Sequence, residues 1–211
     1  MDLLSSLLDM FLHLDKYLLN FVNDYKNWTY LVLFLVIFFE TGLVVTPFLP
    51  GDSLLFAAGA IAALGILNIW LLLGILILAA FLGDTANYSI GSFLGKKAFE
   101  RNYKLIKKEY LLKAHTFYEK HGGKTIIIAR FVPIIRTFAP FVAGIGEMKY
   151  SRFILYNILG GILWVFTCTF SGYFFGNLQI VKDNFSLVIL AIIFISLIPM
   201  LVEYFRHKFK R

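Results

Sequence analysis

The sequence predicts an all-α integral membrane protein with about four transmembrane helices, two opposed re-entrant helical hairpins and an N-terminal amphipathic helix. Three observations predict this fold. Hydrophobic residues make up 59% of the 211 residues, against about 45–50% in soluble proteins. Several apolar runs are long enough to cross a bilayer, which takes about 20 residues. Charges and prolines interrupt two further apolar runs, between Glu40 and Asp52 and between Arg130 and Pro140.

Residues 1–27 are expected to form a helix that lies in the membrane interface. Leucine, phenylalanine and valine recur at helical spacing on one face between Leu3 and Val22, and the opposite face is polar. This pattern is typical of an interfacial amphipathic helix. No lysine or arginine precedes Lys16, so the segment lacks the basic start of a signal peptide.

Four apolar segments are expected to span the membrane, namely 28–46, about 69–95, 153–176 and 185–205. Residues 53–83 carry no charge, and as one helix they would be roughly 46 Å long. That length exceeds the bilayer core of about 30 Å. The break at Gly65 and Asn68 therefore separates a re-entrant segment at 47–65 from the span that follows it.

A second re-entrant segment is expected at 125–148. Pro133 and Pro140 interrupt this apolar run, and Gly144 and Gly146 follow near its end. Lipid cannot satisfy the backbone groups that a proline frees, so the broken chain must be buried in protein or line a watery path. The sequence therefore predicts a single membrane domain over residues 1–211, with two such broken segments.

The basic residues set the expected orientation. Nine lysines and arginines fall in the segment 96–124, and four more lie at 206–211. Cytoplasmic loops of membrane proteins carry an excess of these residues, so both segments and both termini are expected inside the cell. The net charge of +7 is explained by this topology, and no nucleic acid is expected as a partner.

A weak internal repeat accompanies the two broken segments. Phe56-Ala-Ala-Gly59 resembles Phe141-Val-Ala-Gly144, and each is followed by a span that ends in Gly-x-x-x-Gly. Two re-entrant-plus-span units that enter from opposite faces would form an inverted repeat, as in many transporters. Gly-x-x-x-Gly also arises in spans through helix packing alone, so the repeat supports the topology only.

Four charged residues in the broken runs form the candidate site: Glu40, Asp52, Arg130 and Arg136. Ionisable groups are costly in hydrocarbon and usually mark a functional site. Pro133 bends the chain between the two arginines, so both could reach one point, and the planar guanidinium group suits a phosphate. The alternative is that the arginines only pair with carboxylates or freed carbonyls. The carboxylates would neutralise the arginines in either case, and a further role in proton coupling stays open.

Supporting residues surround these four charges. Asp84 lies within the expected span 69–95 and is expected to support the site from the bundle interior rather than to contact a substrate. The others are helix breakers or could bond the carbonyls that the breaks free. They are Thr41, Pro47, Pro50, Gly51, Pro133, Thr137, Pro140 and Gly144.

No motif of a soluble enzyme is present in the sequence. It contains no Gly-x-Ser-x-Gly motif and no P-loop, so neither enzymatic activity nor ATP use is expected. His115 and His121 lie six residues apart without a third ligand, and no metal or cofactor is expected.

The same stretches resemble the DedA family of bacterial membrane proteins, also described by the VTT or SNARE-associated domain. The resemblance covers roughly residues 28–176 and shows no departure at the motif positions. The matching stretches are Glu40-Thr-Gly42, Pro47-Phe-Leu-Pro-Gly-Asp52, Phe56-Ala-Ala-Gly59, Gly83-Asp84 with Asn87-Tyr88 and Gly91, His121-Gly-Gly-Lys124, Arg130-Phe-Val-Pro133, Arg136-Thr137, Pro140, Ala143-Gly144 and Met148. The resemblance implies a lipid translocase of the bacterial cytoplasmic membrane, with Glu40, Asp52, Arg130 and Arg136 as its functional residues.

Three functions are compatible with these features. The first, favoured by the arginine pair and the resemblance, is a translocase that moves undecaprenyl phosphate or a similar anionic phospholipid without ATP, with proton coupling as an open addition. The second is a phospholipid scramblase of broad specificity. The third is a proton-coupled ion antiporter with Glu40 and Asp52 as carriers.

The expected partners are a lipid headgroup, the membrane and protons. The sequence is compatible with a homo-oligomer and does not fix the oligomeric state.

Overall fold

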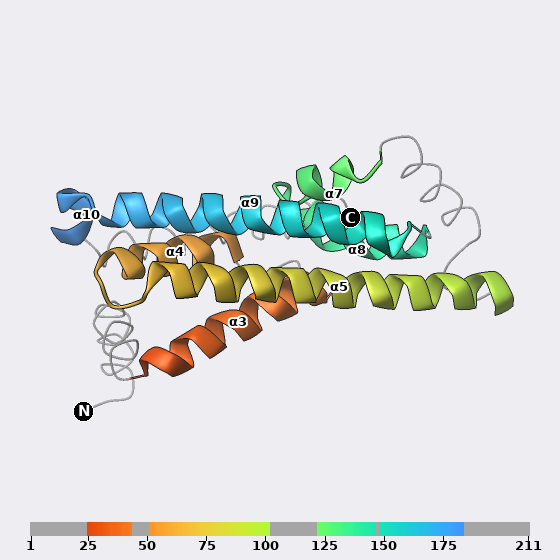
Figure 1. Cartoon of the computed structure of the whole chain (residues 1–211), viewed down its shortest axis with the longest axis horizontal. Helices are drawn as coiled ribbons and strands as arrows, with labels where there is room; N and C mark the ends of the chain where they lie inside the picture. The colour runs from red at the N-terminus through yellow and green to blue at the C-terminus, as the bar shows by residue number, and fades with distance from the viewer. Residues whose placement is uncertain (1–24, 44–50, 102–121, 147, 184–211) are drawn as a thin grey trace, which may run out of the picture. The chain divides into compact units, whose positions relative to one another are not determined.

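The computed structural model describes residues 25–43, 51–101, 122–146 and 148–183, and all regular structure in these ranges is helical (Figure 1). No strand occurs in these residues, which confirms the all-α prediction. The helices are α3 (Lys26–Gly42), α4 (Gly51–Ala63), α5 (Ile69–Arg101), α7 (Lys124–Ala129), α8 (Pro133–Ile145), α9 (Tyr150–Gly176) and α10 (Gln179–Asp183).

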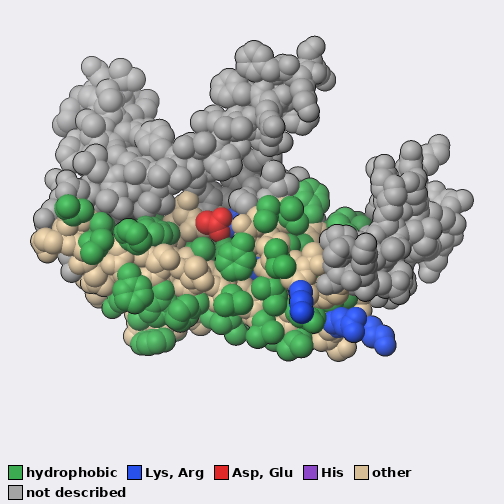
Figure 2. All heavy atoms as spheres, turned by 90° about the horizontal axis from the view of Figure 1, so that it is seen from above, with side chains coloured by type: hydrophobic (Ala, Val, Ile, Leu, Met, Phe, Trp, Pro, Cys, Tyr) green, Lys and Arg blue, Asp and Glu red, His purple; other side chains and the backbone are tan. Residues whose placement is uncertain are grey.

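Two of the expected spans are long apolar helices. The apolar part of α5 covers Ile69–Leu94, with 26 residues, and α9 covers Tyr150–Gly176, with 27 residues. At about 1.5 Å per residue each is longer than the bilayer core of about 30 Å. Large hydrophobic side chains on both helices are exposed, and Figure 2 shows hydrophobic side chains spread over the described part of the face that it presents. The exposed apolar surface suits a lipid environment.

The other expected spans are described only in part or not at all. Helix α3 has 17 residues and ends at Gly42, four residues before the expected end of the span 28–46. The span 185–205 and the interfacial helix up to residue 24 lie outside the described residues. The number of transmembrane helices therefore stays a prediction.

The structure places breaks where the sequence predicts re-entrant segments. Helix α4 lies within 47–65, and the segment 125–148 divides into α7 and α8 with Arg130–Val132 between them. Val132 is extended, with φ −114° and ψ 109°, as steric contact with a following proline favours. Helices α4 and α8 have 13 residues each, or about 20 Å, which is too short to cross a bilayer. Whether each segment enters and leaves on the same side stays a prediction.

The expectation that Pro140 breaks the helix is wrong, because α8 continues through it to Ile145. A proline inside a helix removes one backbone hydrogen bond and costs about 3 kcal/mol. Tertiary packing accompanies the unbroken helix here, since Pro140 is buried, as are Ala139 and Ala143 of the same helix. Pro133 does act as expected, because α8 begins at this residue, where a missing N–H is tolerated.

The basic segment 96–124 is also partly described. Helix α5 runs on to Arg101, so the span and the start of the basic segment form one continuous helix. Residues 102–121 lie outside the described part. Gly122 has φ +67°, a conformation that favours glycine, just before α7 begins at Lys124.

The chain divides into two compact units, each described by itself. Unit 1 comprises Met1–Leu33, Pro50–Leu73 and Thr167–Arg211, and unit 2 comprises Phe34–Leu49 and Gly74–Phe166. Helices α3, α5 and α9 each contribute one part to unit 1 and the other part to unit 2. The prediction of one membrane domain over residues 1–211 stays a prediction.

In unit 1, α4 and the last part of α9 pack through two glycines at very close range. A Cβ added at Gly59 would overlap the carbonyl of Thr169, and a Cβ added at Gly172 would overlap the carbonyl of Phe56. Each glycine therefore faces the backbone of the other helix, which is the close approach that small residues permit in membrane proteins.

Unit 2 contains the same reciprocal contact between α8 and α5. A Cβ at Gly144 would overlap the carbonyl of Tyr88, and a Cβ at Gly91 would overlap the carbonyl of Phe141. Both units thus pair a Phe-x-x-Gly stretch on a short helix with a glycine on a long helix. The repeat seen in the sequence accompanies a repeat in helix packing, and the inverted orientation of the two halves stays a prediction.

Candidate functional site

Arg136 and Glu40 form a buried ion pair in unit 2. Nη2 of Arg136, near the start of α8, donates a hydrogen bond to Oε1 of Glu40, near the end of α3. The two side chains are 7% and 0% exposed. A charge is stable in an apolar interior only when it is paired, so the burial of each residue depends on the other.

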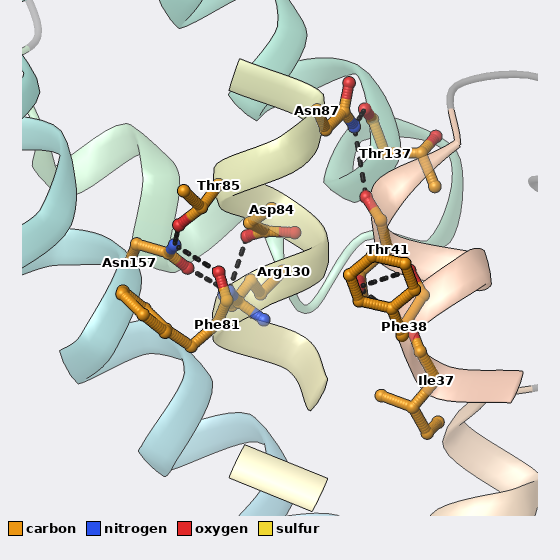
Figure 3. A network of polar contacts seen from close by, with 10 residues as sticks. All are labelled: Ile37, Phe38, Thr41, Phe81, Asp84, Thr85, Asn87, Arg130, Thr137 and Asn157. Atoms are coloured by element: carbon orange, nitrogen blue, oxygen red, sulfur yellow. Dashed lines mark hydrogen bonds and ion pairs between the residues drawn. The ribbon is translucent and has the colours of Figure 1, made fainter. Parts of the chain in front are cut away.

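Arg130 forms a second buried ion pair in the same unit. Its Nη2 donates to Oδ2 of Asp84 at 2.5 Å and also to Oδ1 of Asn157 (Figure 3). Arg130 follows the last residue of α7, Asp84 lies on α5, and Asn157 lies on α9. The single nitrogen thus joins three helical segments. Asp84, expected as a support, is the carboxylate partner of one of the two arginines.

One face of α9 is shaped around Arg130. Asn157, Gly160, Gly161 and Trp164 recur at the i, i+3, i+4 and i+7 spacing of a single helix face. A Cβ at Gly160 would lie 3.0 Å from Cδ of Arg130, and a Cβ at Gly161 would lie 3.7 Å from its Nη2. The glycines therefore leave room for the arginine side chain to lie against the helix. We call these four residues the Arg130 face of α9.

Asn87 connects the two segments that carry the Glu40–Arg136 pair. Its Nδ2 donates to the carbonyl of Thr41 at 3.1 Å and to the carbonyl of Thr137 at 2.7 Å (Figure 3). These two residues directly follow Glu40 and Arg136 in the chain. Both neighbours are acceptors, so only the amide nitrogen can face them, and the orientation of the amide is fixed. Asn87 is fully buried and holds the backbones of α3 and α8 beside the ion pair.

The charges of the described buried residues in unit 2 balance. They are two arginines and two carboxylates, Arg130 with Asp84 and Arg136 with Glu40. An arginine held by a carboxylate can exchange that partner for another oxyanion, because carboxylate and phosphate oxygens accept the same guanidinium hydrogen bonds. The two arginines therefore hold guanidinium N–H groups whose hydrogen bonds carboxylate and phosphate oxygens accept alike.

Asp52, the fourth predicted charge, belongs to unit 1. It is the second residue of α4, where an acidic side chain interacts favourably with the helix dipole. Its Oδ1 lies 4.0 Å from Sγ of Cys168, and the side chain is half-buried. Gly51 begins α4 and is buried, whereas Pro47 and Pro50 lie outside the described residues. Three of the four predicted charges thus lie in unit 2.

The remaining supporting residues have structural contacts in unit 2. The hydroxyl of Thr41 donates to the carbonyl of Ile37 in its own helix at 2.9 Å, and the carbonyl of Thr137 accepts from Asn87. Gly144 gives α8 its close approach to α5. Their proposed support of a transport site stays a prediction.

The contribution of α9 was not predicted from the sequence, in which this segment has the pattern of an ordinary span. Asn157 is fully buried, and its Nδ2 also donates to the carbonyl of Phe81 at 3.2 Å. The ring centroid of Trp164 lies 5.2 Å from Cζ of Arg136 and 6.0 Å from Cζ of Arg130. The available signal was an asparagine inside an apolar run, followed at helical spacing by two glycines and a tryptophan.

Comparison with known proteins places the chain in a family. The model of the VTT domain matches residues 49–174. The chain is 54% identical to "Protein DedA" of Escherichia coli (strain K12), over 99% of this chain and 96% of that protein. It is 45% identical to an uncharacterized membrane protein of Mycobacterium leprae, over 79% of this chain and 75% of that protein. It is 36% identical to the inner membrane protein YqjA of Escherichia coli (strain K12), over 70% of this chain and 68% of that protein. No solved structure matches. With its buried arginine–carboxylate pairs in an apolar helical unit, this chain belongs to the DedA family of membrane proteins.

Proposed function

We propose that this protein is a lipid translocase that moves a phosphate-bearing lipid, undecaprenyl phosphate or a similar anionic phospholipid, across the bacterial cytoplasmic membrane without ATP. One observation carries the proposal. Arg136 is buried in an apolar unit and is held by a carboxylate, which a phosphate can replace. The lipid leaves chemically unchanged, so the protein is a translocase and not an enzyme.

Replacement of Glu40 by a phosphate at Arg136 gives each member of the ion pair a role: Arg136 binds the phosphate, and Glu40 takes up a proton. A phosphate oxygen accepts the guanidinium hydrogen bond that Glu40 accepts in the structure. Glu40 then lacks its cationic partner in a buried place, where an unpaired carboxylate is costly, and it takes up one proton. When the phosphate leaves, Glu40 loses that proton and pairs with Arg136 again. The headgroup and one proton therefore enter together, which makes binding of a monoanion electrically neutral within unit 2.

Reconstitution into vesicles tests this function directly. Vesicles carry undecaprenyl phosphate in both leaflets, and an added phosphatase that cannot cross the membrane removes phosphate from the outer leaflet. With active protein, lipid from the inner leaflet moves to the outer leaflet and also becomes accessible to the phosphatase, in a second phase. Arg136→Ala is expected to slow this second phase by at least about tenfold, because truncating one partner of a buried charge pair costs about 2–5 kcal/mol. The matched control Arg152→Ala removes an exposed arginine of α9 and should keep the parent rate. Equal rates for the parent and Arg136→Ala would contradict the proposal.

The same vesicles separate the two other functions. A scramblase of broad specificity would move labelled phosphatidylcholine as fast as undecaprenyl phosphate, whereas a selective translocase would not. An ion antiporter would carry protons against a potassium or sodium gradient in vesicles made of phosphatidylcholine alone. Proton flux without any anionic lipid would favour the antiporter, and lipid movement without such flux would exclude it.

A further inference from the structure

We propose that Trp164 is a positioning residue that holds the guanidinium groups of Arg130 and Arg136 together, so that both serve one anionic ligand. The inference rests on the proposed function and adds to it the residue that makes the two arginines one site. Trp164 lies on α9 and is 1% exposed.

The indole of Trp164 attracts both arginines without neutralising them. Cζ of Arg136 lies 5.2 Å and Cζ of Arg130 lies 6.0 Å from the ring centroid, within the range of about 6 Å for cation–π attraction. Tryptophan gives the strongest such attraction, and removal of water strengthens it further. A carboxylate occupies guanidinium N–H groups that an anionic ligand requires, whereas an aromatic face leaves those N–H groups available. The hydrogen bonds of Arg130 to Asp84 and Asn157 both use Nη2. Trp164 can therefore keep both arginines in place while a phosphate displaces Glu40.

The rest of the Arg130 face of α9 supports this role. Asn157, two helical turns before Trp164, accepts a hydrogen bond from Nη2 of Arg130, and its own amide is oriented by the carbonyl of Phe81. Gly160 and Gly161 lie between them and admit the arginine side chain. Arg130 is thus fixed along the helix from Asn157 to Trp164. Arg136 comes from a different segment, α8, and meets this face through Trp164.

The chain allows a sharp test because it contains only three tryptophans. Trp28 and Trp70 are 63% and 70% exposed and lie outside the proposed site, so the W28F/W70F protein keeps Trp164 as its single tryptophan. Fluorinated tryptophans can then be placed at position 164 alone. Fluorine withdraws electron density from the ring face and changes the size of the side chain little. It therefore weakens a cation–π contact while it preserves packing.

The probe is dioctanoyl phosphatidic acid in detergent micelles, and calorimetry gives its dissociation constant. We expect the constant to rise stepwise with the number of fluorine atoms, by about two- to tenfold in total, while the thermal unfolding midpoint stays within about 2 degrees. Trp164→Phe should bind severalfold more tightly than Trp164→Leu, because only phenylalanine keeps an aromatic face. A Trp164 with a purely structural role predicts no dependence on fluorine.

The outcomes separate the two proposals. The role of Trp164 is overturned if the probe binds saturably but its dissociation constant changes neither with fluorination nor between Trp164→Phe and Trp164→Leu. This outcome leaves the proposed function intact. If the W28F/W70F protein and the unaltered protein both fail to bind the probe, the proposed function is wrong, and the inference falls with it. A stepwise loss of affinity at constant stability supports both.

Discussion

Asp84→Asn is expected to destabilise the protein strongly, because it leaves Arg130 charged and buried without a carboxylate partner. The two side chains are 4% and 3% exposed, and their atoms approach to 2.5 Å. Asparagine has nearly the same shape as aspartate, so the substitution removes the charge and leaves the packing in place. The effect therefore reports the ion pair rather than a cavity.

The magnitude follows from the burial of the pair. Two unit charges about 4 Å apart attract by about 4 kcal/mol at an effective dielectric constant of about 20. Removing one partner of a buried pair costs about 3–5 kcal/mol. Arg130 keeps its hydrogen bond to Asn157, and the new amide oxygen can still accept one, so we expect the lower end, about 3 kcal/mol.

The assay is equilibrium unfolding in mixed dodecyl maltoside and sodium dodecyl sulfate micelles, applied to a double-mutant cycle. The double variant D84N/R130Q carries no unpaired charge, so it should be about 2 kcal/mol more stable than the sum of the two single effects predicts. Asn177→Ala changes an exposed asparagine and serves as the control, with an expected effect within about 0.5 kcal/mol. Additive effects of D84N and R130Q would refute the view that the pair is stabilised by mutual neutralisation.

Three further substitutions, and Gly74→Ala as a control for the first, are tested by the same unfolding assay. Gly160→Ala would place its Cβ 3.0 Å from Arg130 and should cost about 1–3 kcal/mol, whereas Gly74→Ala, with open space around it, should be neutral or slightly stabilising. If Gly160→Ala lowered the free energy of unfolding less than Gly74→Ala does, the tight fit of Arg130 against α9 would be contradicted. Asn87→Ala leaves two buried carbonyls without their donor and should cost about 2 kcal/mol; an effect near zero would show that the connection between α3 and α8 is not stabilising. Tyr88→Phe removes the hydroxyl that donates to the Met148 carbonyl and should cost about 1 kcal/mol, and an unchanged midpoint would count against that bond.

The sequence predicts the parts of the site that depend on the cost of burying a charge or breaking a helix. A glutamate or an arginine in an apolar run must find a partner, so the pairing of Glu40 and Arg136 with opposite charges follows from the residue types alone. The start of α8 at Pro133 is equally predictable, because a proline without its N–H suits the first turn of a helix.

The choice of partners could not be predicted in this way. The contact between Arg130 and Asp84 joins residues that are 46 positions apart and depends on how α7 lies against α5. Pro140 inside α8 shows a similar limit, since tertiary packing overrides a local helix breaker. The inward position of Trp164 could not be predicted, because lipid and protein interior are equally apolar, whereas Asn157 carries a signal as a polar residue inside an apolar run. The faces of a membrane helix that point inward and outward therefore differ little in hydrophobicity.

The reciprocal glycine contacts have a consequence for how the short helices are held. Where a glycine Cα faces a carbonyl oxygen across a helix interface, its C–H groups can act as weak donors, worth about 0.5–1 kcal/mol each. Water is absent as a competitor in a bilayer, and apolar side chains gain little by leaving lipid for protein. For α4 and α8, the attraction of backbone for backbone at Gly59, Gly172, Gly91 and Gly144 therefore adds to the packing of the buried apolar side chains on these helices. These four positions tolerate no side chain, and a single methyl group there would separate the helices more effectively than the loss of any large hydrophobic residue on their exposed faces.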